Sequence, residues 1–337
     1  MLARAVLPYY PMAMTDGVLK YGGSGTIPVV AGNENFAGAS LNGLSLSCTP
    51  IELLANDGSD SIVGNASGFF WQINGQPYLV SNWHVVSGRN PFTSELNSNA
   101  FIPRRMRFYG LSVSTESGVV TFERIRWTLT WGEDMVDLLA KPPAHEGQPL
   151  DIWGTPIALN SVFGKDSSRT GFKGAAESTC FLNELTGPRI ITNVGDECFI
   201  LGYPLNNYDG IMPPIWKRGS IASETSIGVE GRPVFLVDAA TTAGMSGSPI
   251  IRKATTIAVH NQDLGGLQEI SSYELIGLYA GRLESPRLSA VNIGYGWYRS
   301  MIDKALDHYK TADVKNAAIT SITHGGFSSF RRNQKVF

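Results

Sequence analysis

The chain has 337 residues, of which 43% are hydrophobic and 17% charged, so it can bury a substantial core and is not a disordered polypeptide. Its formal net charge of -2 gives no positive field to gather nucleic acid or an anionic membrane, and we expect neither partner. The 37 glycines and 18 prolines, with aromatic and β-branched residues spread throughout, favour short strands joined by turns. These numbers predict an all-β protein.

The three cysteines, Cys48, Cys180 and Cys198, are odd in number and form no CxxC pair. They predict reduced thiols and no disulfide framework. The histidines lack metal-ligand spacing, so we expect neither a metal nor an organic cofactor. The short apolar run at the N-terminus is interrupted by Pro8 and Pro11, and no segment is long enough to span a bilayer. A cytoplasmic location is the resulting expectation.

The clearest local signal in the first half is a hairpin. Residues 1–40 show no periodicity and predict an irregular N-terminal arm. Apolar runs at residues 69–73 and 78–81 then flank Asn74-Gly75, a pair that accepts the positive φ angles of a type I′ turn. The second strand leads directly into His84, so this side chain is expected at the end of a strand and facing a cleft.

Two further segments complete the first half. Ile125, Trp127, Leu129 and Trp131 alternate with polar residues, the period of a strand with one buried face. The hydrophobic segment 135–140 follows, and the Pro- and Gly-rich stretch 141–178 indicates a crossing between two halves. We expect a first domain over residues 41–150 and a second over 151–312, with a C-terminal tail from 313 to 337.

The second half shows short strand candidates separated by Gly and Pro signals, at residues 197–201, 215–222, 234–237, 249–251 and 275–279. No alternation of strands with helices indicates a parallel sheet. One helix closes this half, predicted from an apolar stripe at helical spacing: Trp297, Tyr298, Met301, Ile302, Ala305, Leu306 and Tyr309.

The strongest chemical signal is a serine ringed by small residues, Ser246 within residues 243–249. A serine hydroxyl is a weak nucleophile that needs a base within hydrogen-bond reach and donors for the oxyanion it creates. Glycines beside it let backbone N–H groups approach a substrate carbonyl. Taken alone, the pattern is equally that of a glycine-rich turn before a strand. It does not complete the G-x-S-x-G elbow of the α/β-hydrolases, and no helical pattern follows it.

Candidate partners lie upstream in the order His84, Asp137, Ser246, which is the chain order of the chymotrypsin-like triad. His84 alone could be a buried structural histidine. Asp134 is an alternative to Asp137, and a carboxylate before an apolar run is often only a cap or turn residue. We prefer Asp137 because apolar residues flank it directly, as a buried orienting carboxylate requires.

Four segments resemble the trypsin-like serine peptidases, nearest the bacterial heat-shock-protease branch. They are residues 67–70 with 78–86, the His84 motif; 135–140, the Asp137 motif; 195–204, the start of a second barrel; and 237–249, the Ser246 motif. The resemblance covers roughly residues 60–300 and implies two antiparallel six-stranded β-barrels, a serine endopeptidase and a polypeptide substrate. No PDZ-like module follows, and the sequence leaves the oligomeric state open.

The resemblance also implies a role for each site residue. His84 is the general base, Asp137 orients it, and the N–H groups of Gly244 and Ser246 form the oxyanion hole. The pocket for the residue before the cut is formed by Ala240 and Thr241, and its wall by Leu278, Tyr279, Ala280 and Gly281. Because no carboxylate lies there, the expected preference is a small or medium apolar residue.

The sequence departs from the family pattern at two places, and it leaves two alternative functions open. Met245 stands where digestive members have an aspartate, so activation through a new N-terminus is not expected. Residues 253–274 form a longer connection than usual near the implied pocket, which could restrict access. A catalytically silent relative that binds peptides in the cleft, or an esterase on the same fold, is the alternative to a peptidase.

Overall fold

The computed structural model describes residues 18–21, 25–28, 43–97, 101–116, 119–157, 181–186, 191–204, 213–259, 267–283, 292–311 and 318–323. Strands dominate these residues, and the predicted all-β class of two barrel-like halves is confirmed. The two halves differ in how far their sheets close.

The first half is an open, curled nine-stranded sheet with the order β10-β5-β4-β3-β6-β7-β1-β2, and β17 pairs with β7 beside β1. Its strands are β1 (Val18–Tyr21), β2 (Gly25–Pro28), β3 (Cys48–Leu54), β4 (Ile62–Ile73), β5 (Gln76–Ser81), β6 (Arg105–Glu116), β7 (Val119–Thr130), β10 (Trp153–Pro156) and β17 (Ala318–Thr323). The expected six strands are therefore supplemented from both ends of the chain. β1 and β2 come from the N-terminal arm, and β17 comes from the C-terminal tail.

The β4–β5 hairpin forms as predicted. Asn74 and Gly75 have φ angles of 50° and 80°, the left-handed values that a type I′ turn requires at both central positions. β10 pairs with β5 from Trp153↔Ser81 to Pro156↔Tyr78. The first sheet thus extends to Pro156, beyond the expected boundary at residue 150.

The second half is a closed six-stranded barrel, β11-β12-β13-β16-β15-β14, as predicted. Its strands are β11 (Glu197–Gly202), β12 (Ile215–Ile221), β13 (Val234–Asp238), β14 (Pro249–Val259), β15 (Leu267–Arg282) and β16 (Ile293–Tyr298). A small two-stranded sheet, β8 (Ala144–His145) with β9 (Gln148–Pro149), precedes β10.

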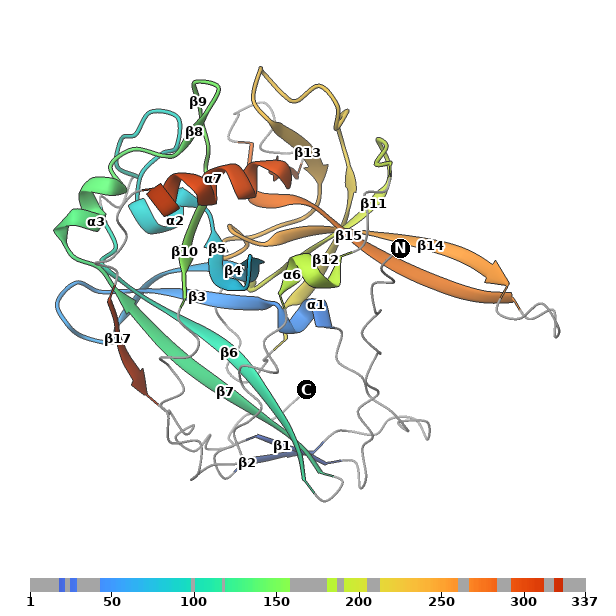
Figure 1. Cartoon of the computed structure of the whole chain (residues 1–337), viewed down its shortest axis with the longest axis horizontal. Coiled ribbons are helices and arrows are strands. Elements are labelled where there is room, and N and C mark those ends of the chain that lie inside the picture. Colours follow the sequence, from blue (N-terminus) through green and yellow to red (C-terminus); the bar gives the residue numbers. More distant parts are fainter. Residues whose placement is uncertain are drawn as a thin grey trace.

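Residues 253–274 were expected as a long connection close to the pocket. Instead β14 and β15 continue through this segment, and they pair in register out to Val259↔Leu267. The two strands form a ribbon that projects from the barrel at the right of Figure 1. The described part of the segment therefore extends the barrel strands outward.

Four short helices and one long one complete the described fold: α1 (Gly43–Leu46), α2 (Trp83–Ser87), α3 (Glu133–Leu138), α6 (Leu182–Leu185) and α7 (Ser300–Thr311). α7 is the predicted closing helix, shown in red in Figure 1, where it lies over β10. Contact with β10 is close, since a Cβ built on Gly154 would lie 2.1 Å from Leu306 Cδ2. The last helix among the described residues therefore packs on the first sheet.

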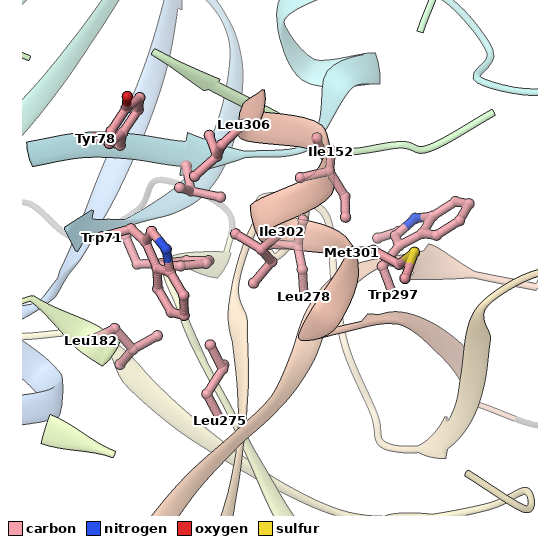
Figure 2. Packing of buried hydrophobic residues seen from close by; sticks show 14 of the residues in the cluster. Trp71, Tyr78, Ile152, Leu182, Leu275, Leu278, Trp297, Met301, Ile302 and Leu306 are labelled. Carbon is pink, nitrogen blue, oxygen red and sulfur yellow. The ribbon is translucent and has the colours of Figure 1, made fainter. Parts of the chain in front are cut away.

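A shared hydrophobic core joins the two halves. Figure 2 shows Trp71 and Tyr78 of the first sheet near Leu278 and Trp297 of the second barrel, with Ile302 of α7 among them. All five side chains are at most 5% exposed. Truncating such a buried side chain to alanine typically costs about 2–5 kcal/mol, so this core fixes the relative position of the two halves.

Candidate active site

His84 lies at the start of α2, and both its backbone N–H and its imidazole ring contact the side chain of Asp151. The His84 N–H donates to Asp151 Oδ1 over 2.8 Å, and its ring Nδ1 lies 2.7 Å from Oδ2. The amide of Asn82 also donates to the Asp151 carbonyl oxygen over 2.8 Å. The Asp151 side chain is fully buried, whereas that of His84 remains 24% exposed. The buried carboxylate of Asp151 therefore fixes one edge of the imidazole, and the His84 side chain stays partly exposed.

Asp137 does not take the position predicted for it beside His84, and the carboxylate that binds the imidazole is that of Asp151. Asp137 lies exposed on α3, where its carbonyl oxygen accepts the N–H of Ala140. Asp151 lies between Leu150 and Ile152, so it has the same direct apolar flanks that favoured Asp137. That signal was present in the sequence for both residues, and only the fold decides between them.

The pKa of the His84 imidazole is raised above its ordinary value of about 6.5. Burial lowers this pKa, because a charged ring is costly away from water. The negative charge of Asp151 and its hydrogen bond to the ring raise the pKa by more than burial lowers it. The pair therefore stabilises an imidazolium, which is the charged form that a general base becomes.

Tyr309 brings α7 into the surroundings of Asp151. Its phenol is buried, and its pKa is raised well above 10, first by burial and then by the negative charge of Asp151. The hydroxyl has no hydrogen-bond partner among the described residues. A neutral, buried Tyr309 thus lies within electrostatic reach of the Asp151 carboxylate.

Ser246 lies in a tight turn between β13 and β14. Gly244 and Gly247 have φ angles of 91° and 85°, which strongly favour glycine. The turn is closed by the Ser248 N–H, which donates to the Met245 carbonyl over 3.1 Å. Within the described part of the chain, the N–H groups of Gly244 and Ser246 donate to no backbone carbonyl. Two donors beside the hydroxyl therefore remain available to a ligand.

Ser67 of β4 holds this turn against the first sheet. Its N–H donates to the Ser246 carbonyl and its Oγ to the Gly244 carbonyl, each over 2.8 Å. Ser67 Oγ also accepts the Tyr203 N–H over 2.9 Å, and the Ser67 carbonyl accepts the hydroxyl of Ser81 over 2.8 Å. Ser67 and Ser81 are completely buried. Since Ser81 ends the strand that precedes His84, this network links the serine turn to the histidine segment.

The Ser246 hydroxyl donates to the carbonyl oxygen of Ala280 over 3.0 Å. Between the two described residues Ser246 and His84 there is no hydrogen bond in this arrangement. Catalytic hydrogen bonds are often made only when substrate is bound, and a hydroxyl reorients by rotation about one bond. The geometry thus places the hydroxyl at the end of β15.

The other expected pocket residues contribute in different ways. Ala240 is exposed beside the turn, whereas Thr241 is buried and shares a hydrogen bond with the hydroxyl of Tyr279. Leu278 points into the core between the halves, as Figure 2 shows, and so offers no side chain to a pocket. A Cβ built on Gly281 would meet no atom within 4 Å, which indicates open space at this strand.

Neither described cysteine competes with Ser246 as a nucleophile. Cys48 and Cys198 are free and buried, and burial raises the pKa of each thiol to about 12. A thiol must ionise to react, and these stay protonated at neutral pH. In the part of the chain that the structure covers, no cluster of histidine, cysteine and acidic side chains has the form of a metal site. None of the described helices combines the length and apolar character of a membrane span.

The chain belongs to the family of trypsin-like peptidase domains, whose model matches residues 66–257, more than half of its length. The match includes His84, Asp151 and Ser246. The protein is accordingly a trypsin-like serine peptidase, a hydrolase that acts on polypeptides.

Comparison with solved structures gives a match to the active form of the Rv3671c protease from M. tuberculosis. The two chains are 13% identical, the match covers 95% of this chain and 98% of that one, and the TM-score is 0.39. A search of curated proteins finds no match.

Proposed function

We propose that Ser246, His84 and Asp151 form the catalytic triad of this serine endopeptidase. The observation that carries the proposal is the 2.7 Å contact between His84 Nδ1 and the buried carboxylate of Asp151. A hydrogen bond from Nδ1–H to Asp151 leaves the other ring nitrogen, Nε2, without a proton. This is the tautomer that a general base needs, and the Ser67 network holds the nucleophile turn against the same half of the molecule.

The reaction follows from these positions. Nε2 of His84 removes the proton from Ser246 Oγ as the oxygen attacks the substrate carbonyl carbon. The carbonyl oxygen becomes an oxyanion that accepts the N–H groups of Gly244 and Ser246. The imidazolium then protonates the leaving amine, the C–N bond breaks, and an acyl-enzyme remains on Ser246. Water, deprotonated by His84, hydrolyses this ester and restores the hydroxyl.

The surroundings of Ser246 favour a small or medium apolar residue before the cut. Ala240 is exposed beside the turn and offers no charge to the substrate. The Ala280 carbonyl and the open space beside Gly281 provide a strand edge with which an extended peptide can pair. A polypeptide, bound as an added strand, is thus the substrate class that fits.

A matched pair of carboxylate variants tests the triad. Asp151→Asn keeps the size of the side chain but alters the histidine tautomer, a change that lowers kcat by about 10⁴-fold in such triads. Asp137→Asn removes an exposed carboxylate and should leave kcat within about twofold, since surface substitutions have small effects. Cleavage of an unfolded protein and hydrolysis of a small ester are measured for both. Equal losses in the two variants, or ester turnover without peptide cleavage, would contradict the proposal.

A further inference from the structure

Two short segments beside Ser246 contain the residues expected to form the pocket for the substrate side chain before the cut. One consists of residues 239–241, between β13 and the serine turn, and the other is the end of β15 after Tyr279. Their spacing is set by Gly294 of β16, which pairs with Val237 of β13 on one side and with Arg282 of β15 on the other. The expected pocket therefore corresponds to the space between these strand ends.

The phenol ring of Tyr279 occupies this space. Its backbone is fixed beside the serine turn, because Gly247 N–H donates to the Tyr279 carbonyl over 3.0 Å and Tyr279 N–H donates to the Ser248 carbonyl over 2.8 Å. The side chain crosses to the opposite segment, where its hydroxyl and that of Thr241 share a hydrogen bond. Only 2% of Tyr279 remains exposed.

The ring also fills the space beside β16. A Cβ built on Gly294 would lie 2.6 Å from Tyr279 Cε2 and 2.9 Å from its hydroxyl oxygen, closer than such atoms can approach. Ala239, Met245 and Phe235 belong to the same buried cluster as the ring. Gly294 and Tyr279 are thus complementary in size. If the ring moved away, the buried Thr241 hydroxyl would lose its hydrogen bond to Tyr279.

We propose that Tyr279 is the specificity-determining residue of this peptidase, and that its ring limits the residue before the cut to glycine, alanine or serine. The inference rests on the proposed triad and narrows the substrate class from small or medium residues to small ones. Ala240 is exposed, and a Cβ built on Gly281 would meet no atom within 4 Å, so the open space beside the ring lies at small residues.

A peptide library that varies only the residue before the cut tests this proposal on the wild-type protein. We expect cleavage after Gly, Ala and Ser, with kcat/KM for Leu and Phe at least about 10²-fold lower, since a pocket lacking the needed volume rejects large groups strongly. Equal or better cleavage after Leu, Phe, Lys or an acidic residue would overturn it. Labelling of Ser246 by a fluorophosphonate is measured in parallel. A labelled serine with the wrong preference contradicts only the role of Tyr279, whereas an unlabelled one contradicts the triad.

Three variants then assign the effect to the ring. Tyr279→Ala should raise kcat/KM for Leu and Phe relative to Ala by at least about 10-fold, because it frees the volume of a phenol. Tyr279→Phe keeps the ring and should retain the wild-type preference. Tyr298→Ala makes the same truncation elsewhere in the barrel, where Tyr298 stacks on Phe235, and should also leave the preference unchanged. Rates are normalised to the fraction of each variant that the fluorophosphonate labels. A Tyr279→Ala enzyme that is labelled but keeps the wild-type preference would overturn the proposal.

Discussion

Replacing Ser67 with alanine removes one oxygen that holds two buried groups. Ser67 Oγ donates to the Gly244 carbonyl over 2.8 Å and accepts the Tyr203 N–H over 2.9 Å. Leaving a buried polar group without its partner costs about 1–3 kcal/mol. With two groups affected, the free energy of unfolding should fall by about 2–6 kcal/mol, measured by urea denaturation at neutral pH.

The same change should reduce catalysis beyond its effect on stability. Once the Gly244 carbonyl is released, the neighbouring peptide is free to turn, and one of the two proposed oxyanion donors loses its fixed direction. Loss of one such donor typically lowers kcat by about 10²–10³-fold. KM should change little, because the donor acts on the transition state and not on the bound peptide. Both constants are measured with a peptide that has alanine before the cut, under conditions where the variant is fully folded.

Ser47→Ala is the matched control. Ser47 is also completely buried, and its hydroxyl donates over 2.8 Å to a backbone carbonyl, that of Leu44. Its partner belongs to the short helix α1 and not to the serine turn. The control should lose stability but keep kcat. If Ser67→Ala loses stability and also keeps the wild-type kcat, the argument that Ser67 positions the oxyanion donors is refuted.

Two further predictions concern the histidine and the turn. The kcat/KM of the wild-type enzyme should fall as pH drops through an apparent pKa above 6.5, because only neutral His84 accepts a proton and Asp151 raises its pKa. In Asp151→Asn this limb of the pH profile should move to lower pH, and an unchanged limb would contradict the pairing. Gly247→Ala should lower kcat at least about 10²-fold, since its Cβ would lie 2.0 Å from the Ser67 carbonyl oxygen at a φ of 85°. Gly132→Ala, whose Cβ meets nothing within 4 Å, is the control, and equal activity of the two variants would refute the steric argument.

Features set by neighbouring residues were predictable from the sequence. The Asn74-Gly75 hairpin and the helix α7 depend on contacts within a few positions, and both form, although Trp297 and Tyr298 of the predicted helical stripe lie in β16. The glycines around Ser246 likewise predict a turn with positive φ angles, which Gly244 and Gly247 adopt. In each case the local pattern determines the local structure almost alone.

Features set by contacts between distant segments were not predictable in the same way. Asp137 and Asp151 have equally apolar flanks, and the choice between them depends on Asn82 and His84, which bind Asp151 from a position nearly 70 residues earlier. The first sheet also includes β1, β2 and β17, which come from segments near the two ends of the chain. The ring of Tyr279 was expected to be part of a pocket wall, and the proposal that it fills the pocket depends on its hydrogen bond to Thr241 and its closeness to Gly294, which only the fold reveals.

The most direct test of the proposed catalytic site is the mass-spectrometric identification of the residue that a fluorophosphonate modifies. We expect a single adduct on Ser246, absent in Ser246→Ala and formed far more slowly in His84→Ala. Ser248 provides an internal control, because its hydroxyl is completely buried against Gly202 and should stay unmodified. An adduct on Ser248, no adduct at all, or labelling of Ser246 at an unchanged rate in His84→Ala would contradict the proposal that His84 activates Ser246.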